Sequence, residues 1–273
     1  GELFVGVSGS GDLTISNGGL VENTVGYIGT FPGSTGSTVT VDGAGSTWTN
    51  SGDLVVGYYG SGELKLTISN GGHVGSHHGS IARYAGSSGD VTVDGPGSSW
   101  TNSGSLYVGG SESSAGGAGE LTVSNGGTVN VADTLKVWPT GTVELLGSQI
   151  NTGSFIVEPG GTFTHTAGTL TVDGGTFDPG VGDYTIDGAG NPTLELINGG
   201  NASITARLYV GYHAAGELNI SNGGQVVNTY CYIGAGPSSI GTVTVDNGTW
   251  NNSGNLYVGD RGSGELNISN GGQ

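Results

Sequence analysis

Aromatic side chains at a regular spacing are the residues of this sequence best suited to bind a partner. Tyrosines recur in the middle of short alternating segments such as Leu-Tyr-Val-Gly at 106–109, or in the loop that follows such a segment. Outward copies can bind a glycan, a host surface or a neighbouring molecule, or can simply stack on one another and stabilise a sheet. Both interpretations stay open at this point. The residues of this predicted aromatic stripe are Tyr27, Tyr58, Tyr59, Tyr107, Tyr209, Tyr212, Tyr232 and Tyr257, and the same positions of other repeats hold Phe4 and Tyr84.

The other residues that could do chemistry do not form a catalytic or metal-binding pattern. His73, His77 and His78 lie close together, but they lack the helical spacing and the cysteine partners of typical zinc sites. Arg83 and Arg261 lie in different repeats. The acidic residues recur periodically, as on a solvated face, and no repeat supplies the oxygen cluster that calcium needs. We therefore predict no catalytic residue, no metal site and no cofactor.

A repeated phrase positions these side chains. Its clearest copy is Gly-Glu-Leu-Asn-Ile-Ser-Asn-Gly-Gly at 264–272, variants start at residues 11, 64, 119 and 216, and a sister phrase, Val-Thr-Val-Asp, starts at residues 39, 91 and 243. The repeats are roughly 23 to 29 residues long, which is typical of a solenoid coil. Each repeat holds three short alternating strands separated by glycine turns. We therefore predict an all-β fold, a parallel β-helix of about ten to eleven three-stranded coils.

Alternation within the strands predicts which side chains fill the core. In Leu-Tyr-Val at 106–108, Leu and Val point inward and Tyr points outward. In the third strand of some repeats, Trp48, Trp100 and Trp250 stand where other repeats have valine. Bulky and slimmer residues on successive coils can fill a narrow core without voids. Cys231 occupies a position where other repeats have leucine, so we expect a buried, unreactive thiol.

Two columns of asparagine are predicted to be structural. Asn followed by Gly adopts left-handed backbone angles readily, and amides stacked on successive coils can hydrogen-bond along a column. The first predicted Asn ladder, at the turn after the second strand, consists of Asn17, Asn70, Asn125, Asn222 and Asn270. The second column ends the third strand and consists of Asn23, Asn50, Asn102, Asn228 and Asn252.

The composition limits the possible partners. The 273 residues include 60 Gly and a single Cys, and 5 basic against 22 acidic residues give a formal net charge of -17. Such a charge argues against binding to nucleic acid or to anionic lipid. No apolar run is long enough to span a membrane, and no leader follows Gly1. Because the chain begins and ends within a repeat, we expect a piece of a longer protein whose export signal and anchor lie outside it.

The repeats are not uniform along the chain. Regular coils are predicted for residues 1–134 and 208–273. Residues 135–207 contain four of the seven prolines and degraded copies of the phrase, but apolar alternation persists there. We therefore predict irregular coils of one continuous solenoid in this stretch, and not a linker or a separate domain.

The phrases GELTISNGG, VTVDGxGSxWTNSG and LYVG resemble the repeats of large secreted bacterial proteins of the type V secretion (autotransporter) class and of PEP-CTERM-linked exoproteins. The resemblance covers residues 3–130 and 208–273, and the stretch between them only in general style. It implies a right-handed parallel β-helix, the passenger of an adhesin-like surface protein of a Gram-negative bacterium. These families have no catalytic residues to transfer to this segment.

Together these observations predict a non-enzymatic, extracellular stalk or fibre on a bacterial surface or in a secreted, biofilm-type matrix. Its predicted partners are cell-surface glycans or proteins, or further copies of itself, with no nucleic acid and no membrane insertion. A self-assembling filament subunit that stacks end to end is the main alternative. A polysaccharide-acting β-helix enzyme is a third possibility.

Overall fold

The computed structural model describes residues 1–273 and contains strands, turns and loops but no helix. None of its segments is therefore a helix that could cross a membrane. The chain is a parallel β-solenoid of about eleven turns, which confirms the predicted all-β fold class. It divides into two compact units. Unit 1 consists of residues Gly1–Glu144 and Val157–Thr164, and unit 2 of residues Leu145–Ile156 and His165–Gln273.

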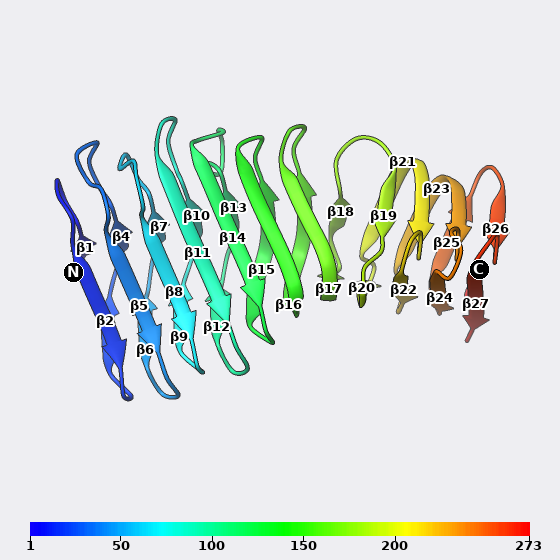
Figure 1. Cartoon of the computed structure of the whole chain (residues 1–273), viewed down its shortest axis with the longest axis horizontal. Helices are drawn as coiled ribbons and strands as arrows, with labels where there is room; N and C mark the ends of the chain where they lie inside the picture. Colours follow the sequence, from blue (N-terminus) through cyan, green and yellow to red (C-terminus); the bar gives the residue numbers. More distant parts are fainter. The chain divides into compact units, whose positions relative to one another are not determined.

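Unit 1 has three faces, and strands of consecutive coils pair in parallel on each face (Figure 1). The first face contains β1 (Leu3–Val5), β4 (Gly26–Ile28), β7 (Leu54–Val56), β10 (Gly79–Ile81) and β13 (Leu106–Val108). The second face contains β2 (Asp12–Ser16), β5 (Thr38–Asp42), β8 (Lys65–Ser69), β11 (Ser88–Asp94) and β14 (Ala118–Ser124). The third face contains β3 (Leu20–Asn23), β6 (Thr47–Asn50), β9 (His73–Ser76) and β12 (Ser99–Asn102). Strand β15 (Thr128–Val137) runs from the third face onto the first.

Unit 2 repeats this plan with longer strands that turn from the third face directly into the first. Its strands are β18 (Thr176–Asp178), β19 (Tyr184–Ile186), β20 (Gly190–Ile197), β21 (Asn201–Val210), β22 (Ala215–Ser221), β23 (Gln225–Ile233), β24 (Ile240–Asp246), β25 (Thr249–Asn252), β26 (Leu256–Val258) and β27 (Ser263–Ser269). Strands β16 (Gly141–Val157) and β17 (Thr162–Asp173) contribute residues to both units. Register shifts interrupt the pairing between Ala167 and Thr169 and between Ile204 and Arg207.

The alternating pattern of each strand produces the core. In β11 every second residue is buried, with Val91 and Val93 fully enclosed, while Thr92 between them faces outward. Parallel pairing in register then places Val91 between Leu66 and Leu121 of the adjacent coils. Apolar residues of successive coils therefore stack along the inside of the solenoid, and burial of these side chains is the main favourable term in its stability.

Tryptophan and glycine complement each other inside the same coil. Trp100 is fully buried, and Gly79, which opens the same coil, stands in register between Leu54 and Leu106. A Cβ atom on Gly79 would lie 2.8 Å from Cζ2 of Trp100. Gly26 and Trp48 form the same combination in an earlier coil, where the corresponding distance is 2.7 Å. The missing side chain thus provides the volume that the indole fills.

Cys231 completes this pattern in unit 2. It opens the coil that contains Trp250, and it lies in register between Leu208 and Leu256. Cysteine is smaller than these two leucines, so a coil with a tryptophan again opens with a small residue, as the coils of Gly26 and Gly79 do in unit 1. Burial raises the pKa of the Cys231 thiol to about 12, and the side chain is fully enclosed. The structure therefore places this residue in the core, as the sequence predicts.

We expect Cys231 to be unreactive in the native protein. Thiolate is the reactive form of cysteine, and a thiol with so high a pKa carries almost none at pH 8. A disulfide reagent that releases a coloured thiolate should show no reaction over an hour under native conditions and one equivalent of reaction in denaturant. A Ser51→Cys variant, whose new thiol is exposed, should react at once in the native state and so provides the control. Equal rates for Cys231 in the native and denatured protein would contradict the assignment.

Candidate functional site

An outer column of side chains runs along the first face, because the middle residue of each three-residue strand points away from the core. In unit 1 the outer column reads, coil by coil, Phe4, Tyr27, Val55, Ser80 and Tyr107. In unit 2 it reads Thr185, Tyr209, Tyr232 and Tyr257. The predicted aromatic stripe is thus continuous over three coils of unit 2 but interrupted in unit 1.

The unit 2 part of the column is a stack of parallel rings. Tyr209 and Tyr232 have ring centroids 5.1 Å apart at an interplanar angle of 17°, and Tyr232 and Tyr257 are 4.7 Å apart at 10°. This spacing matches the distance between adjacent strands. Because the ring faces cover one another, the stack presents ring edges and hydroxyl groups to its surroundings. Tyr212, from the following loop, lies 4.9 Å from Tyr209 and is 39% exposed.

A carboxylate fixes the loop that carries Tyr212. Oδ1 of Asp187 accepts hydrogen bonds from the backbone N–H groups of Tyr212, His213 and Ala214 at 2.9, 3.0 and 2.7 Å. Charge-assisted bonds of this kind are stronger than neutral ones, so they hold the loop beside the stack. Sequence reasoning missed Asp187, because it follows a strand in the irregular stretch where the repeated phrase is lost.

A groove lies next to the unit 2 stack. Its volume is about 360 Å³, and its walls include Tyr209, Tyr212, Tyr232, Pro237 and Arg261. Aromatic rings, hydroxyl groups and one guanidinium therefore border the same open space. Such a mixture of apolar surface and a few polar groups is typical of sites that bind other molecules.

The unit 1 aromatics form a cluster that the first-face loops complete. Phe4 stacks on Tyr27 at 5.0 Å, Tyr58 meets the edge of Tyr27 at 5.6 Å, and Tyr59 stacks on Tyr84 at 4.6 Å. Tyr58 hydrogen-bonds to Tyr84, which together with burial raises the pKa of Tyr58 to about 12. The structure thus brings together Tyr27, Tyr58 and Tyr59 of the predicted stripe.

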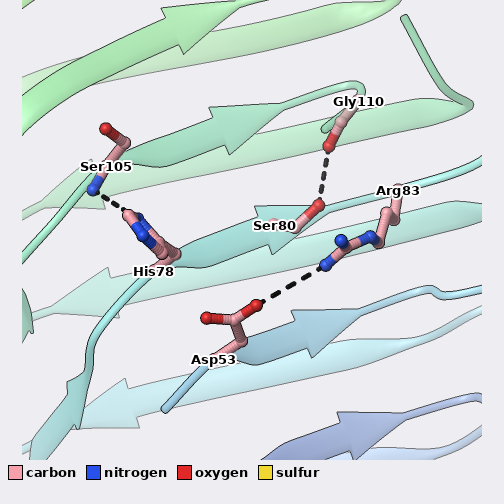
Figure 2. Close-up of polar contacts among 6 residues, drawn as sticks. All are labelled: Asp53, His78, Ser80, Arg83, Ser105 and Gly110. Atoms are coloured by element: carbon pink, nitrogen blue, oxygen red, sulfur yellow. Dashed lines mark hydrogen bonds and ion pairs between the residues drawn. The ribbon is translucent and has the colours of Figure 1, made fainter. Parts of the chain in front are cut away.

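Arg83 connects this cluster to the interrupted part of the outer column. Its guanidinium carbon lies 5.8 Å from the ring centroid of Tyr58 and 5.9 Å from that of Tyr84. Its Nη1 lies 3.8 Å from Oδ2 of Asp53, the ion pair drawn in Figure 2. Cation–π contacts and this long ion pair therefore hold the guanidinium at the edge of the cluster.

Tyr107 is not part of the unit 1 cluster. Val55 and Ser80 occupy the outer column between it and Tyr27, and both are almost fully buried. A cavity of about 50 Å³ lies beside Ser80 and is lined by Asp53, His78, Arg83, Tyr107 and Glu112. Ser80 and His78 are tied to the backbone of the next coil, Ser80 Oγ to the Gly110 carbonyl and His78 Nδ1 to the Ser105 N–H (Figure 2).

Comparison with known proteins adds little to this geometry. No family model matches the chain, and no curated protein matches it significantly. Among solved structures it is similar to the crystal structure of the TibC-catalyzed hyper-glycosylated TibA55-350 fragment. The two share 16% sequence identity over 98% of this chain and 94% of that chain, with a TM-score of 0.26. So low a TM-score supports no conclusion about function.

The three neighbouring histidines bond to different partners. His73 Nδ1 pairs with Ser99 Oγ at 2.8 Å, and His77 Nδ1 pairs with Ser103 Oγ at 3.1 Å, whereas His78 uses a backbone N–H. No group of three or more His, Cys, Asp or Glu side chains in the structure is placed to hold a metal ion.

The first predicted Asn ladder has different partners from those expected. Its five residues have left-handed φ values between 50° and 56°. In unit 1, however, a coil with aspartate separates successive asparagines. Asp42 Oδ1 accepts hydrogen bonds from Ser69 Oγ at 2.6 Å and from Asn70 Nδ2 at 2.7 Å, and these bonds hold the pKa of Asp42 below its usual value. Asp94 binds Asn125 in the same way. The bonds therefore run from Asn to Asp and not from Asn to Asn.

The second asparagine column does contain bonds between amides. Asn23 Nδ2 donates to Asn50 Oδ1 at 2.6 Å, and Asn228 Nδ2 donates to Asn252 Oδ1 at 2.6 Å. The first asparagine of each pair also accepts a hydrogen bond from a tryptophan indole. Trp48 Nε1 donates to Asn23 Oδ1 at 2.7 Å, and Trp250 Nε1 donates to Asn228 Oδ1 at 2.6 Å. The structure thus adds a polar partner for the core tryptophans that the sequence pattern did not show.

Proposed function

We propose that this chain is a non-enzymatic segment of an extracellular adhesive β-solenoid, on a bacterial surface or secreted, and that it binds its partner through the aromatic residues of the first face. The observation that carries the proposal is the stack of Tyr209, Tyr232 and Tyr257 beside an open groove. The partner class that fits is a cell-surface glycan or protein. Tyrosine suits such contacts because it offers large apolar area and a hydroxyl group at little conformational cost.

The distribution of the remaining polar residues supports binding rather than catalysis. A catalytic acid and base must converge within hydrogen-bond reach of one reacting atom. In this chain several acidic side chains recur with the coils instead, as Asp42, Asp94 and Asp246 do at equivalent turns, where each accepts bonds from Ser and Asn. Their carboxylates are thus committed to holding the turns together.

The proposal predicts that the triple variant Tyr209→Ser, Tyr232→Ser, Tyr257→Ser loses binding to its glycan or cell target. Truncating a central aromatic contact residue often costs 2 kcal/mol or more, so we expect at least about a thirtyfold loss of affinity. The measurement is binding of the purified chain to immobilised glycans and to whole cells. The circular dichroism spectrum should not change, because these rings are partly exposed and lie outside the core.

A matched control lies on the second face of the same unit. The variant Asn219→Ser, Thr244→Ser, Asn267→Ser changes three outward residues that are stacked in register in the same way, and it should bind like the wild type. Equal binding by the tyrosine variant and this control would overturn the proposal. Concentration-dependent oligomers in sedimentation that disappear in the tyrosine variant would instead identify further copies of the chain as the partner.

A further inference from the structure

We propose that the cavity beside Ser80 in unit 1 binds one neutral sugar, with an edge of the pyranose ring entering the cavity against the ring of Tyr107. This inference rests on the proposed function, because it names a ligand class for a chain proposed to be adhesive. It concerns residues that the tyrosine stack of unit 2 does not contain.

The outer column of aromatic residues is interrupted at Ser80. Where aromatic residues follow one another in this column, each ring covers the face of the next at about one strand spacing, as Phe4 and Tyr27 do at 5.0 Å. Ser80 stands next to Tyr107 in register and has no ring to place over it. The cavity lies here and is lined by both residues. One edge of a flat ligand can therefore enter the space next to Tyr107 that a tyrosine ring occupies elsewhere in the column.

His78 and Arg83 supply hydrogen-bond donors at the cavity. The Ser105 N–H can only donate, so Nδ1 of His78 accepts, and the neutral imidazole carries its hydrogen on Nε2 as a donor. Arg83 adds a guanidinium whose contact with Asp53, at 3.8 Å, is longer than a hydrogen bond. Arg83 lines the cavity, and a guanidinium carries five N–H donors, so it can donate to a ligand oxygen there.

The carboxylates at the cavity supply hydrogen-bond acceptors and make its net charge negative. Two carboxylates, Asp53 and Glu112, border the cavity together with the single guanidinium of Arg83. A sugar hydroxyl both donates and accepts, so it can use donors and acceptors that lie side by side. An anionic sugar would meet two negative charges against one positive charge, on a chain with a net charge of -17. The site therefore fits a neutral pyranose and disfavours a uronic or sialic acid.

The cavity volume sets the extent of the contact. About 50 Å³ accommodates a hydroxymethyl group or one edge of a ring, together with its hydroxyls, and not a buried oligosaccharide. We therefore expect weak binding of a single sugar, with a dissociation constant on the order of 1 mM. An adhesive protein reaches useful strength from such sites through many simultaneous contacts.

The full chain is titrated with methyl glucopyranoside and with methyl galactopyranoside, and binding is measured by saturation-transfer difference NMR. Methyl glucuronide serves as the anionic probe. At least one neutral glycoside should bind, and the glucuronide should bind at least about tenfold more weakly. Ser80→Tyr should abolish binding, because it supplies the ring that the ligand replaces. Tyr107→Leu and Arg83→Gln should each weaken binding at least about tenfold, and they guard against a folding defect in the Ser80 variant.

A matched control adds a tyrosine to the same column elsewhere. Thr185 stands in register with Tyr209, is exposed, and lies outside the cavity, so Thr185→Tyr should bind the neutral glycoside like the wild type. Absence of binding by both neutral glycosides, or equal binding by Ser80→Tyr and Thr185→Tyr, overturns the inference. If the wild-type chain binds cells and only the substitution of Tyr209, Tyr232 and Tyr257 abolishes cell binding, the proposed function stands without this site.

Discussion

Gly79→Leu should strongly destabilise unit 1, and adding Trp100→Val to it should restore much of the lost stability. A Cβ atom at residue 79 would lie 2.6 Å from Leu106 Cδ1, 2.7 Å from Asn102 Oδ1 and 2.8 Å from Trp100 Cζ2. Overpacking by a whole leucine side chain should therefore cost about 3 kcal/mol or more. Trp100→Val alone should cost about 3 kcal/mol, because it leaves a cavity in the core.

The double variant should lose less than the sum of the two single losses, by about 2 to 3 kcal/mol. Its coil would have the same pair of residues as its neighbours, which combine Leu54 with Val74 and Leu106 with Val129. Gly79 has no left-handed φ, so the backbone accepts leucine there. The measurement is urea-induced unfolding followed by circular dichroism for the wild type, both single variants and the double variant.

The control combines Gly79→Leu with substitution of a tryptophan from a different coil. Trp48 belongs to another coil, where Gly26 makes room for it. Trp48→Val should therefore add its full cost to Gly79→Leu without any rescue. If Trp48→Val rescued Gly79→Leu as well as Trp100→Val did, the coil-by-coil complementarity would be refuted.

Asn50→Asp should strongly destabilise unit 1, although the two side chains have almost the same shape. Asn50 is 3% exposed; its Oδ1 accepts from Asn23 Nδ2 at 2.6 Å and its Nδ2 donates to the Gly75 carbonyl at 3.2 Å. Aspartate keeps the shape but replaces the donor with a carboxylate oxygen that faces a carbonyl. We expect a loss of about 2 to 4 kcal/mol at pH 7, since a buried charge loses hydration and a buried acceptor loses its donor.

The loss should shrink as the pH falls. Burial disfavours the charged form, so the folded-state pKa of the new carboxyl group is raised above its unfolded value of about 3.9. Between the two values the folded state binds more protons, and stability relative to the wild type rises with falling pH. Urea midpoints at pH 7 and pH 4 measure this difference. Asn17→Asp introduces the same charge at an exposed turn and should change stability little at either pH.

An Asn50→Asp variant that behaved like Asn17→Asp would show that the amide column contributes nothing to the fold. A loss that did not depend on pH would show that the carboxylate is solvated. At each pH the urea midpoint of the variant is compared with that of the wild type, so a general effect of pH on stability does not enter the difference.

Local patterns in the sequence are enough to predict the fold class. The repeated phrase has a fixed period, and alternation of apolar residues such as Val91 and Val93 decides which side chains enter the core, because successive residues of a strand point to opposite sides. The Asn-Gly pairs at residues such as 17 and 70 likewise marked turns with left-handed φ. These are local properties, and a few adjacent residues are enough to specify them.

The contacts between residues of different coils could not be predicted from these local patterns. Pairing in register brings together residues about one coil apart, and the chemistry of each column depends on the neighbour in the next coil. Asn70 thus donates to Asp42 and not to another asparagine, and Gly79 proves to be the partner of Trp100. The aromatic stripe follows the same principle: the tyrosine pattern predicted its existence, but Ser80 in the same column interrupts it and leaves the cavity beside Tyr107. A sequence period specifies a column, whereas the contacts within the column depend on side-chain volumes and donors that come from different coils.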